Sequence, residues 1–198
     1  MLFADIAFTR KSRRILKWTT GIRVEIKNIE ELDREAIEEV DSIIAILSPL
    51  IAPLSMERVN SGGNLHIYRA VDTAPLSSRP RKIVHLNGLA KINSETPLSW
   101  DIKYAHIYDG KHVRTQTLMH EFEHALGLEH PFRLYEYYLT IGRSAIPQHY
   151  TAYGGWLRFH SMPYYISPQE KAAIRLLYSP AIRPGLHHDT FTRGMDLE

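Results

Sequence analysis

The 198-residue sequence contains no cysteine. This absence excludes disulfide bonds, thiolate metal ligands and a cysteine nucleophile. It is compatible with a secreted protein but does not by itself assign a compartment. No signal peptide is predicted, because no uninterrupted apolar segment with a small-residue cleavage site follows the basic residues near the N-terminus.

Long apolar runs and a strong net charge are also missing. The best apolar run, residues 43–54, is shorter than a membrane span and contains Pro49 and Pro53, so no membrane span is predicted. The formal net charge is only +2, which indicates no nucleic acid or other polyanionic partner. The basic run at 10–14 lacks interleaved aromatic residues, so we expect residues 1–14 to form a flexible, solvated arm rather than a nucleic-acid patch.

The composition that remains is globular. Hydrophobic residues make up 44% of the chain and charged residues 23%, which is typical of a folded domain that can bury a sizeable core. The length predicts a single domain over residues 1–198, with a polar tail at 181–198.

Alternating strand and helix patterns favour an α/β fold. Residues 22–27 alternate apolar and charged side chains, which predicts a strand with one buried face. An amphipathic helix follows, with Asn28 or Asp33 as its N-cap and Pro49 as its limit. Further elements are predicted as strands at 64–71, 82–92 (with an irregularity at Gly88) and 102–108, and as a C-terminal helix that starts with a capping box at 167–170.

The most informative stretch reads HEFEHALGLEH and has the spacing H-E-x-x-H-x-x-G-x-x-H. It supplies His120, Glu121, His124, Gly127 and His130. Apolar residues recur around it at helical spacing, so the first two histidines lie one turn apart on one side of a helix. A glycine after the last periodic residue can take the left-handed conformation that ends a helix, and the chain can then bring the third histidine back.

Three imidazoles with no fourth protein ligand are typical of a catalytic zinc site. Structural zinc sites are closed by four ligands, usually including cysteine. We therefore predict that His120, His124 and His130 bind Zn²⁺ and leave one position open. Glu121 points away from the ion but within reach of a water on it, which suits a general base. The alternative is a helix whose histidines are ordinary surface or core residues.

This motif resembles the extended zinc motif of the metzincin metalloproteases. The resemblance implies a zincin domain: a twisted, mostly parallel sheet with an antiparallel edge strand, a backing helix, the zinc helix and a C-terminal helix. It also implies that an extended peptide or protein substrate pairs with the edge strand, for which 82–92 is the candidate. The recognisable similarity covers residues 117–178 and is closest to the serralysin and matrixin branches, without the glycine-rich calcium repeats of serralysins.

A second part of the resemblance lies about thirty residues beyond the third histidine. Met162 matches the methionine of the metzincin Met-turn, which forms a hydrophobic floor beneath the zinc ligands. Tyr164 matches the tyrosine that several metzincins place beside the metal. The family pattern S-x-M-x-Y is altered here, since His160 stands two residues before Met162 and the serine is at 161. Either Tyr164 or Tyr165 therefore faces the metal, and the distance from Met162 favours Tyr164.

The sequence thus predicts a zinc-dependent endopeptidase. Glu121 would accept a proton from the attacking water and deliver it to the leaving nitrogen, with Tyr164 as a second donor to the oxyanion. One alternative is a zinc-stabilised module that binds peptides or proteins without cleaving them, although structure alone does not require Glu121. Another is an enzyme that acts on a non-peptide amide.

Overall fold

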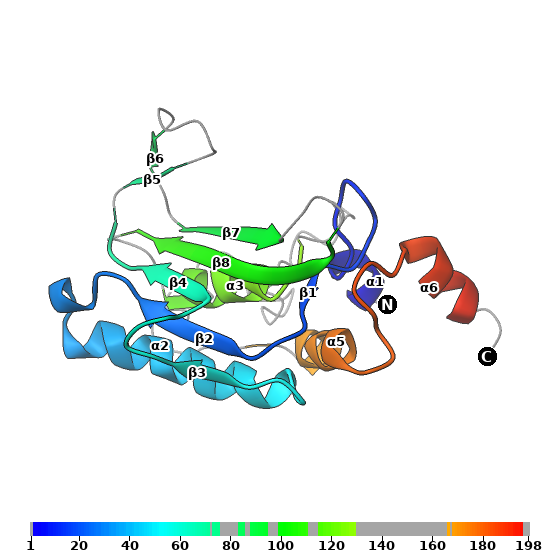
Figure 1. Ribbon diagram of the computed structural model, residues 1–198, viewed down its shortest axis with the longest axis horizontal. Coiled ribbons are helices and arrows are strands. Elements are labelled where there is room, and N and C mark those ends of the chain that lie inside the picture. Colours follow the sequence, from blue (N-terminus) through cyan, green and yellow to red (C-terminus); the bar gives the residue numbers. More distant parts are fainter. Residues whose placement is uncertain are drawn as a thin grey trace, which may run out of the picture.

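The computed structural model describes residues 2–71, 73–75, 83–85, 88–94, 99–110, 115–129, 166 and 168–195. Its architecture is α/β, as predicted, with a mostly parallel sheet and several helices (Figure 1). The strands of the main sheet are β1 (Lys17–Trp18), β2 (Ile22–Ile26), β3 (Met56–Arg58), β4 (Leu65–Tyr68), β7 (Gly88–Ser94) and β8 (Asp101–Asp109). The larger helices are α2 (Arg34–Leu47), α3 (Thr115–Ala125), α5 (Pro168–Tyr178) and α6 (His188–Met195).

The strand order of the main sheet is β1-β8-β4-β2-β3, and β7 pairs with β8. The pairs β1/β8, β4/β8, β2/β4 and β2/β3 are parallel, whereas β7 runs antiparallel to β8. Among the described strands, none pairs with the other side of β7. Within the described residues β7 is therefore an antiparallel edge strand, as the resemblance implied, and an unpaired strand edge can accept an extended chain.

The predicted strand at 82–92 is divided in the structure. Residues Ile83–His85 form β6, which pairs with β5 (Thr73–Pro75) in a separate two-stranded sheet, and only Gly88–Ser94 form the edge strand β7. The irregularity in the β7 register falls between Asn93 and Ser94 rather than at Gly88. Periodicity cannot detect this division, because both pieces have strand-like composition and only their partners differ.

Helix α2 begins where the sequence indicated. The side chain of Asp33 accepts a hydrogen bond from the amide of Ala36 at 2.8 Å, and it is the N-cap. Asn28 instead precedes a short 3₁₀ helix, Ile29–Glu31, and makes no side-chain cap. The buried residues of α2 lie on one face, which turns toward the sheet: Val40, Ile43, Ile44 and Leu47.

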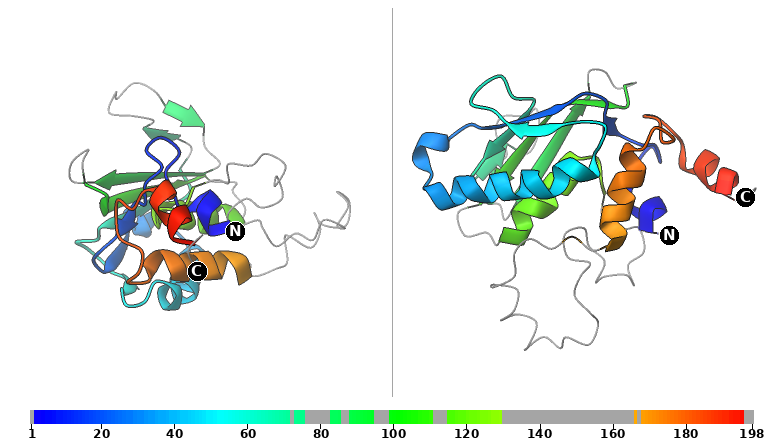
Figure 2. Two further views of the ribbon diagram at one scale, coloured as in Figure 1. Left: turned by 90° about the vertical axis from the view of Figure 1, so that its right-hand side faces the viewer. Right: turned by 90° about the horizontal axis from the view of Figure 1, so that it is seen from below.

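Helices α2, α3 and α5 lie on one side of the sheet (Figure 2, right). The core between them and the sheet contains Trp18 of β1 and Phe122 of α3, both fully buried. Helix α3 packs against β7 and β8, which places the H-E-x-x-H motif beneath the edge of the sheet. None of the helices in the described part of the chain is long and apolar enough to cross a membrane.

The N-terminal segment is packed rather than solvated as expected, and the polar segment near the C-terminus contains a helix. The N-terminal segment contains α1 (Leu2–Ile6) and is anchored by four buried residues: Phe3, Ile6, Ala7 and Phe8. Near the other end, Ile182 is buried and α6 follows it. The basic residues were expected to keep the first segment in solvent, but burial of its apolar residues packs it against the core instead.

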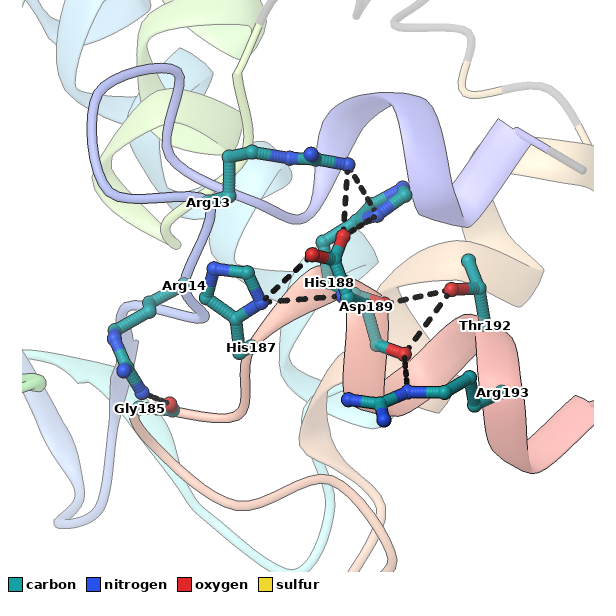
Figure 3. Close-up of polar contacts among 8 residues, drawn as sticks. All are labelled: Arg13, Arg14, Gly185, His187, His188, Asp189, Thr192 and Arg193. Carbon is teal, nitrogen blue, oxygen red and sulfur yellow. Dashed lines mark hydrogen bonds and ion pairs between the residues drawn. The ribbon is translucent and has the colours of Figure 1, made fainter.

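Polar contacts tie these two segments together (Figure 3). Arg14 donates to the carbonyl oxygen of Gly185 at 2.7 Å, and the amide of His188 donates to the carbonyl oxygen of Arg13 at 2.9 Å. The guanidinium of Arg13 also donates to Nδ1 of His188 at 2.6 Å and pairs with Asp189 at 3.2 Å. Residues near the two termini therefore form one packed unit beside the sheet.

Candidate metal centre

Helix α3 ends in a Schellman motif built on Gly127. This glycine has a φ of +97°. The amide of Gly127 donates to the carbonyl oxygen of His124 at 2.8 Å, and the amide of Leu128 donates to the carbonyl oxygen of Glu123 at 3.1 Å. These are the two bonds that define the motif. An added Cβ at Gly127 would lie 2.0 Å from the carbonyl oxygen of Leu16, so both the backbone conformation and the close approach require glycine here.

Two buried side chains cap the remaining carbonyls at the same helix end. Nε1 of Trp18 donates to the carbonyl oxygen of Ala125 at 2.8 Å. The hydroxyl of Tyr178 donates to the carbonyl oxygen of Leu126 at 2.8 Å. The last four carbonyl groups of a helix have no partner within the helix. Here the carbonyl oxygens of Glu123, His124, Ala125 and Leu126 each accept a hydrogen bond, which stabilises the end of this helix.

The side chains of His120 and His124 face each other from successive turns of α3. Their ring centroids are 4.4 Å apart, and their Nε2 atoms are separated by 3.0 Å. Nδ1 of His124 lies 2.7 Å from the carbonyl oxygen of Leu128. A carbonyl oxygen only accepts, so Nδ1 carries the proton and the neutral ring presents its lone pair at Nε2.

This geometry fits a shared zinc ion. Two imidazole nitrogens bound to one tetrahedral zinc at about 2.0–2.1 Å lie roughly 3.3 Å apart, close to the observed 3.0 Å between the two Nε2 atoms. Zinc-bound histidines usually donate their other ring N–H to a carbonyl or carboxylate, and His124 makes such a bond to Leu128. In the part of the chain that the structure describes, no group of three or more potential ligand side chains is assembled.

The other predicted site residues lie outside the described residues. These are His130, Met162 and Tyr164, together with the alternative Tyr165. The described chain reaches the residue before the third histidine. There, the amide of Glu129 donates to the carbonyl oxygen of Ile6 at 2.6 Å, so the N-terminal segment fixes the path by which the chain leaves the helix.

Glu121 is buried between α3 and the edge strand, with a relative exposure of 5%. Burial has the largest effect on its carboxyl and raises the pKa to about 7. A hydrogen bond from the amide of Ala90 lowers this pKa, whereas the negative charge of Asp109 raises it further. A Cβ atom at Gly88 would lie 2.6 Å from Oε1 of Glu121. The carboxyl thus occupies space that exists because residue 88 has no side chain.

A second buried carboxyl lies at the end of β8. Asp109 is the register partner of Gly88 and is 2% exposed. Its pKa is raised to about 6, because burial outweighs the opposing effect of the Arg69 guanidinium. Nε of Arg69 donates to Oδ2 of Asp109 at 3.1 Å, and Arg69 also forms an ion pair with Glu39 of α2. Within this network, the carboxylate of Asp109 supplies the negative charge that acts on Glu121.

Sequence reasoning did not identify the residues that support this site from other elements. Trp18 and Tyr178 cap the helix, Gly88 and Ala90 contact Glu121, and Asp109 lies behind it. The only sequence signal for any of them was the glycine within the predicted edge strand. Each acts through contacts between distant segments, which no local pattern reveals.

Comparison with known proteins identifies no relative: no protein-family model matches this chain, and no curated protein sequence is significantly similar to it.

Proposed function

We propose that the protein is a zinc-dependent endopeptidase with a metzincin-like fold. The observation that carries this proposal is the convergence of His120 and His124, whose Nε2 atoms are 3.0 Å apart, beside the buried carboxyl of Glu121. His130 is the third proposed ligand. When bound, zinc supplies a Lewis acid that lowers the pKa of a bound water toward about 7 and stabilises negative charge on a peptide oxygen.

Glu121 is proposed as the general acid and base. Burial raises its pKa to about 7 in the metal-free protein, and a bound zinc ion would favour the charged form, which can take a proton from water and return it to the leaving nitrogen. The amide of Ala90 donates to the carboxyl and favours its charged form. A buried glutamate beside two histidines would lower stability in a purely structural helix, because burying a carboxylate is unfavourable. This cost favours a catalytic role.

The substrate is proposed to be a peptide or protein bound in an extended conformation along β7. Support comes from the antiparallel pairing of β7 with β8 and from its open edge among the described strands. The amides and carbonyls of an edge strand bind any extended backbone. The scissile bond would then lie close to α3, because α3 packs directly against β7.

Two residues outside the described part of the chain complete the proposed site. Met162 would form the hydrophobic floor under the zinc ligands, and Tyr164 would donate a hydrogen bond to the oxyanion. Both proposals rest on the resemblance of this region to the metzincin Met-turn.

The test is cleavage of a peptide library by the zinc-loaded protein and by its Glu121→Gln variant. Glutamine keeps the shape of the side chain but removes the base, so turnover should fall by at least about a hundredfold while zinc content and folding stay unchanged. Equal cleavage by both forms would exclude Glu121 as the base. If neither form cleaves but the protein retains peptides, it is a binding module instead.

A further inference from the structure

The carboxyl of Glu121 lies against the edge strand at a position where that strand has no side chain. A Cβ atom at Gly88 would be 2.6 Å from Oε1 and 2.9 Å from Cγ of Glu121. Contacts of that length do not occur for real Cβ atoms, so any other residue at position 88 would displace the carboxyl or the strand. The glycine is not needed for the backbone, because its φ lies outside the left-handed region.

The neighbouring groups of β7 complete the surroundings of this carboxyl. The amide of Ala90, two residues along the strand, donates to Glu121. Gly88 and Ala90 have register partners on β8, Asp109 and Ile107, so both lie on a strand that is paired along its length. The base is thus held on one side by its own helix and on the other by a strand with a fixed position.

We propose that Gly88 is a positioning residue that sets where the Glu121 carboxyl lies, so that the edge strand proposed to bind substrate also aligns the general base. This inference rests on the proposed function. A displacement of about 1 Å in a catalytic group can lower the rate about a hundredfold without affecting binding. Gly88 touches no substrate in this scheme and acts only through Glu121.

The first test is the Gly88→Ala variant of the full chain, with its fastest-cleaved library peptide as the probe. The turnover number should fall between about tenfold and a hundredfold, while KM and zinc content change by less than about twofold. Gly194→Ala is the matched control, since a Cβ there meets nothing within 4 Å. A turnover number for Gly88→Ala within about twofold of the wild type would overturn the proposal.

A double-mutant cycle separates positioning from a general loss of structure. If Gly88→Ala acts through the carboxylate, adding it to Glu121→Gln should lower the residual rate by less than about twofold. Independent effects that multiply would overturn the proposal. The same Cβ would also meet Cγ2 of Thr117 at 2.7 Å. The Thr117→Ala/Gly88→Ala double variant relieves that contact, keeps the overlap with Glu121, and should therefore remain slow even if Gly88→Ala alone folds poorly.

Crystal structures of the metal-free wild type and Gly88→Ala distinguish this proposal from the proposed function. If the wild type cleaves no peptide, the endopeptidase proposal fails, but the position of the carboxyl can still be measured. Displacement of Glu121 away from the Ala90 amide in the variant supports the positioning role. A carboxyl in the same place in both structures overturns it.

Discussion

Replacing Tyr178 by phenylalanine tests whether the capped end of α3 stabilises the protein. The Tyr178 hydroxyl donates to the carbonyl oxygen of Leu126 at 2.8 Å, and the residue is only 3% exposed. Burial raises the pKa of this phenol, so the hydroxyl stays protonated and remains a donor. Phenylalanine fills nearly the same space but leaves a buried carbonyl without that donor.

The expected cost follows from the loss of one partner of a buried hydrogen bond. An unsatisfied buried carbonyl costs about 1–3 kcal/mol. For a chain of this size, each kcal/mol lowers the melting temperature by about 2–4 °C, so we expect a decrease of about 2–12 °C.

Urea and thermal unfolding of the zinc-free protein measure this effect. The control is Tyr104→Phe, because Tyr104 is 46% exposed and its replacement should change the unfolding free energy by less than about 0.5 kcal/mol. A Tyr178→Phe variant as stable as this control would show that the Leu126 carbonyl does not depend on the hydroxyl, and the capping argument would be refuted.

The remaining predictions concern the helix end, the buried carboxyl behind the base, the oxyanion donor and the metal. Gly127→Ala should lower the unfolding free energy by at least about 2 kcal/mol in urea titrations, because φ is +97° and the new Cβ would overlap the carbonyl of Leu16; unchanged stability would contradict the helix-end geometry. The folded-state pKa of Asp109 is raised from 3.8 to about 6, so the folded protein keeps a proton that the unfolded chain has already released. Asp109 should therefore contribute a decrease of about 3 kcal/mol in the unfolding free energy of the zinc-free protein as pH rises from about 4 to about 6, and urea titrations of Asp109→Asn should lack this contribution and show a flatter pH dependence. Tyr164→Phe should lower the turnover number up to about a hundredfold with little change in KM. A large loss in Tyr165→Phe with none in Tyr164→Phe would mean that Tyr165 faces the metal. Chelators should remove zinc, and zinc affinity measured by competition should fall as pH drops through the histidine range; a tightly retained metal at low pH would point to different ligands.

The elements that could be predicted from sequence are those specified by local chemistry. Helix α3 and its end at Gly127 follow from helical spacing and from the conformational freedom of glycine. The N-cap at Asp33 is equally local, since a carboxylate three residues before an orphan amide can accept from it. The mostly parallel α/β sheet also matches the prediction.

The features that could not be predicted depend on which distant segments meet. The predicted strand at 82–92 contains pieces that pair with different partners, β5 and β8. The N-terminal segment reads as a basic arm, yet Phe8 is fully buried. The pKa of Glu121 depends on its burial against β7, and Asp109 lies behind it only because β8 ends there. Hydrophobic packing and desolvation between remote segments leave no periodic trace in a single sequence.

X-ray diffraction at the zinc absorption edge, from crystals of the zinc-loaded protein, shows whether the histidines of α3 bind the metal. We expect one strong anomalous peak about 2.0–2.1 Å from Nε2 of both His120 and His124, with His130 as the third ligand. No peak at these two nitrogens, or a peak only at the partly buried pair His187 and His188 in the C-terminal segment, would contradict the assignment of this helix as a metal centre.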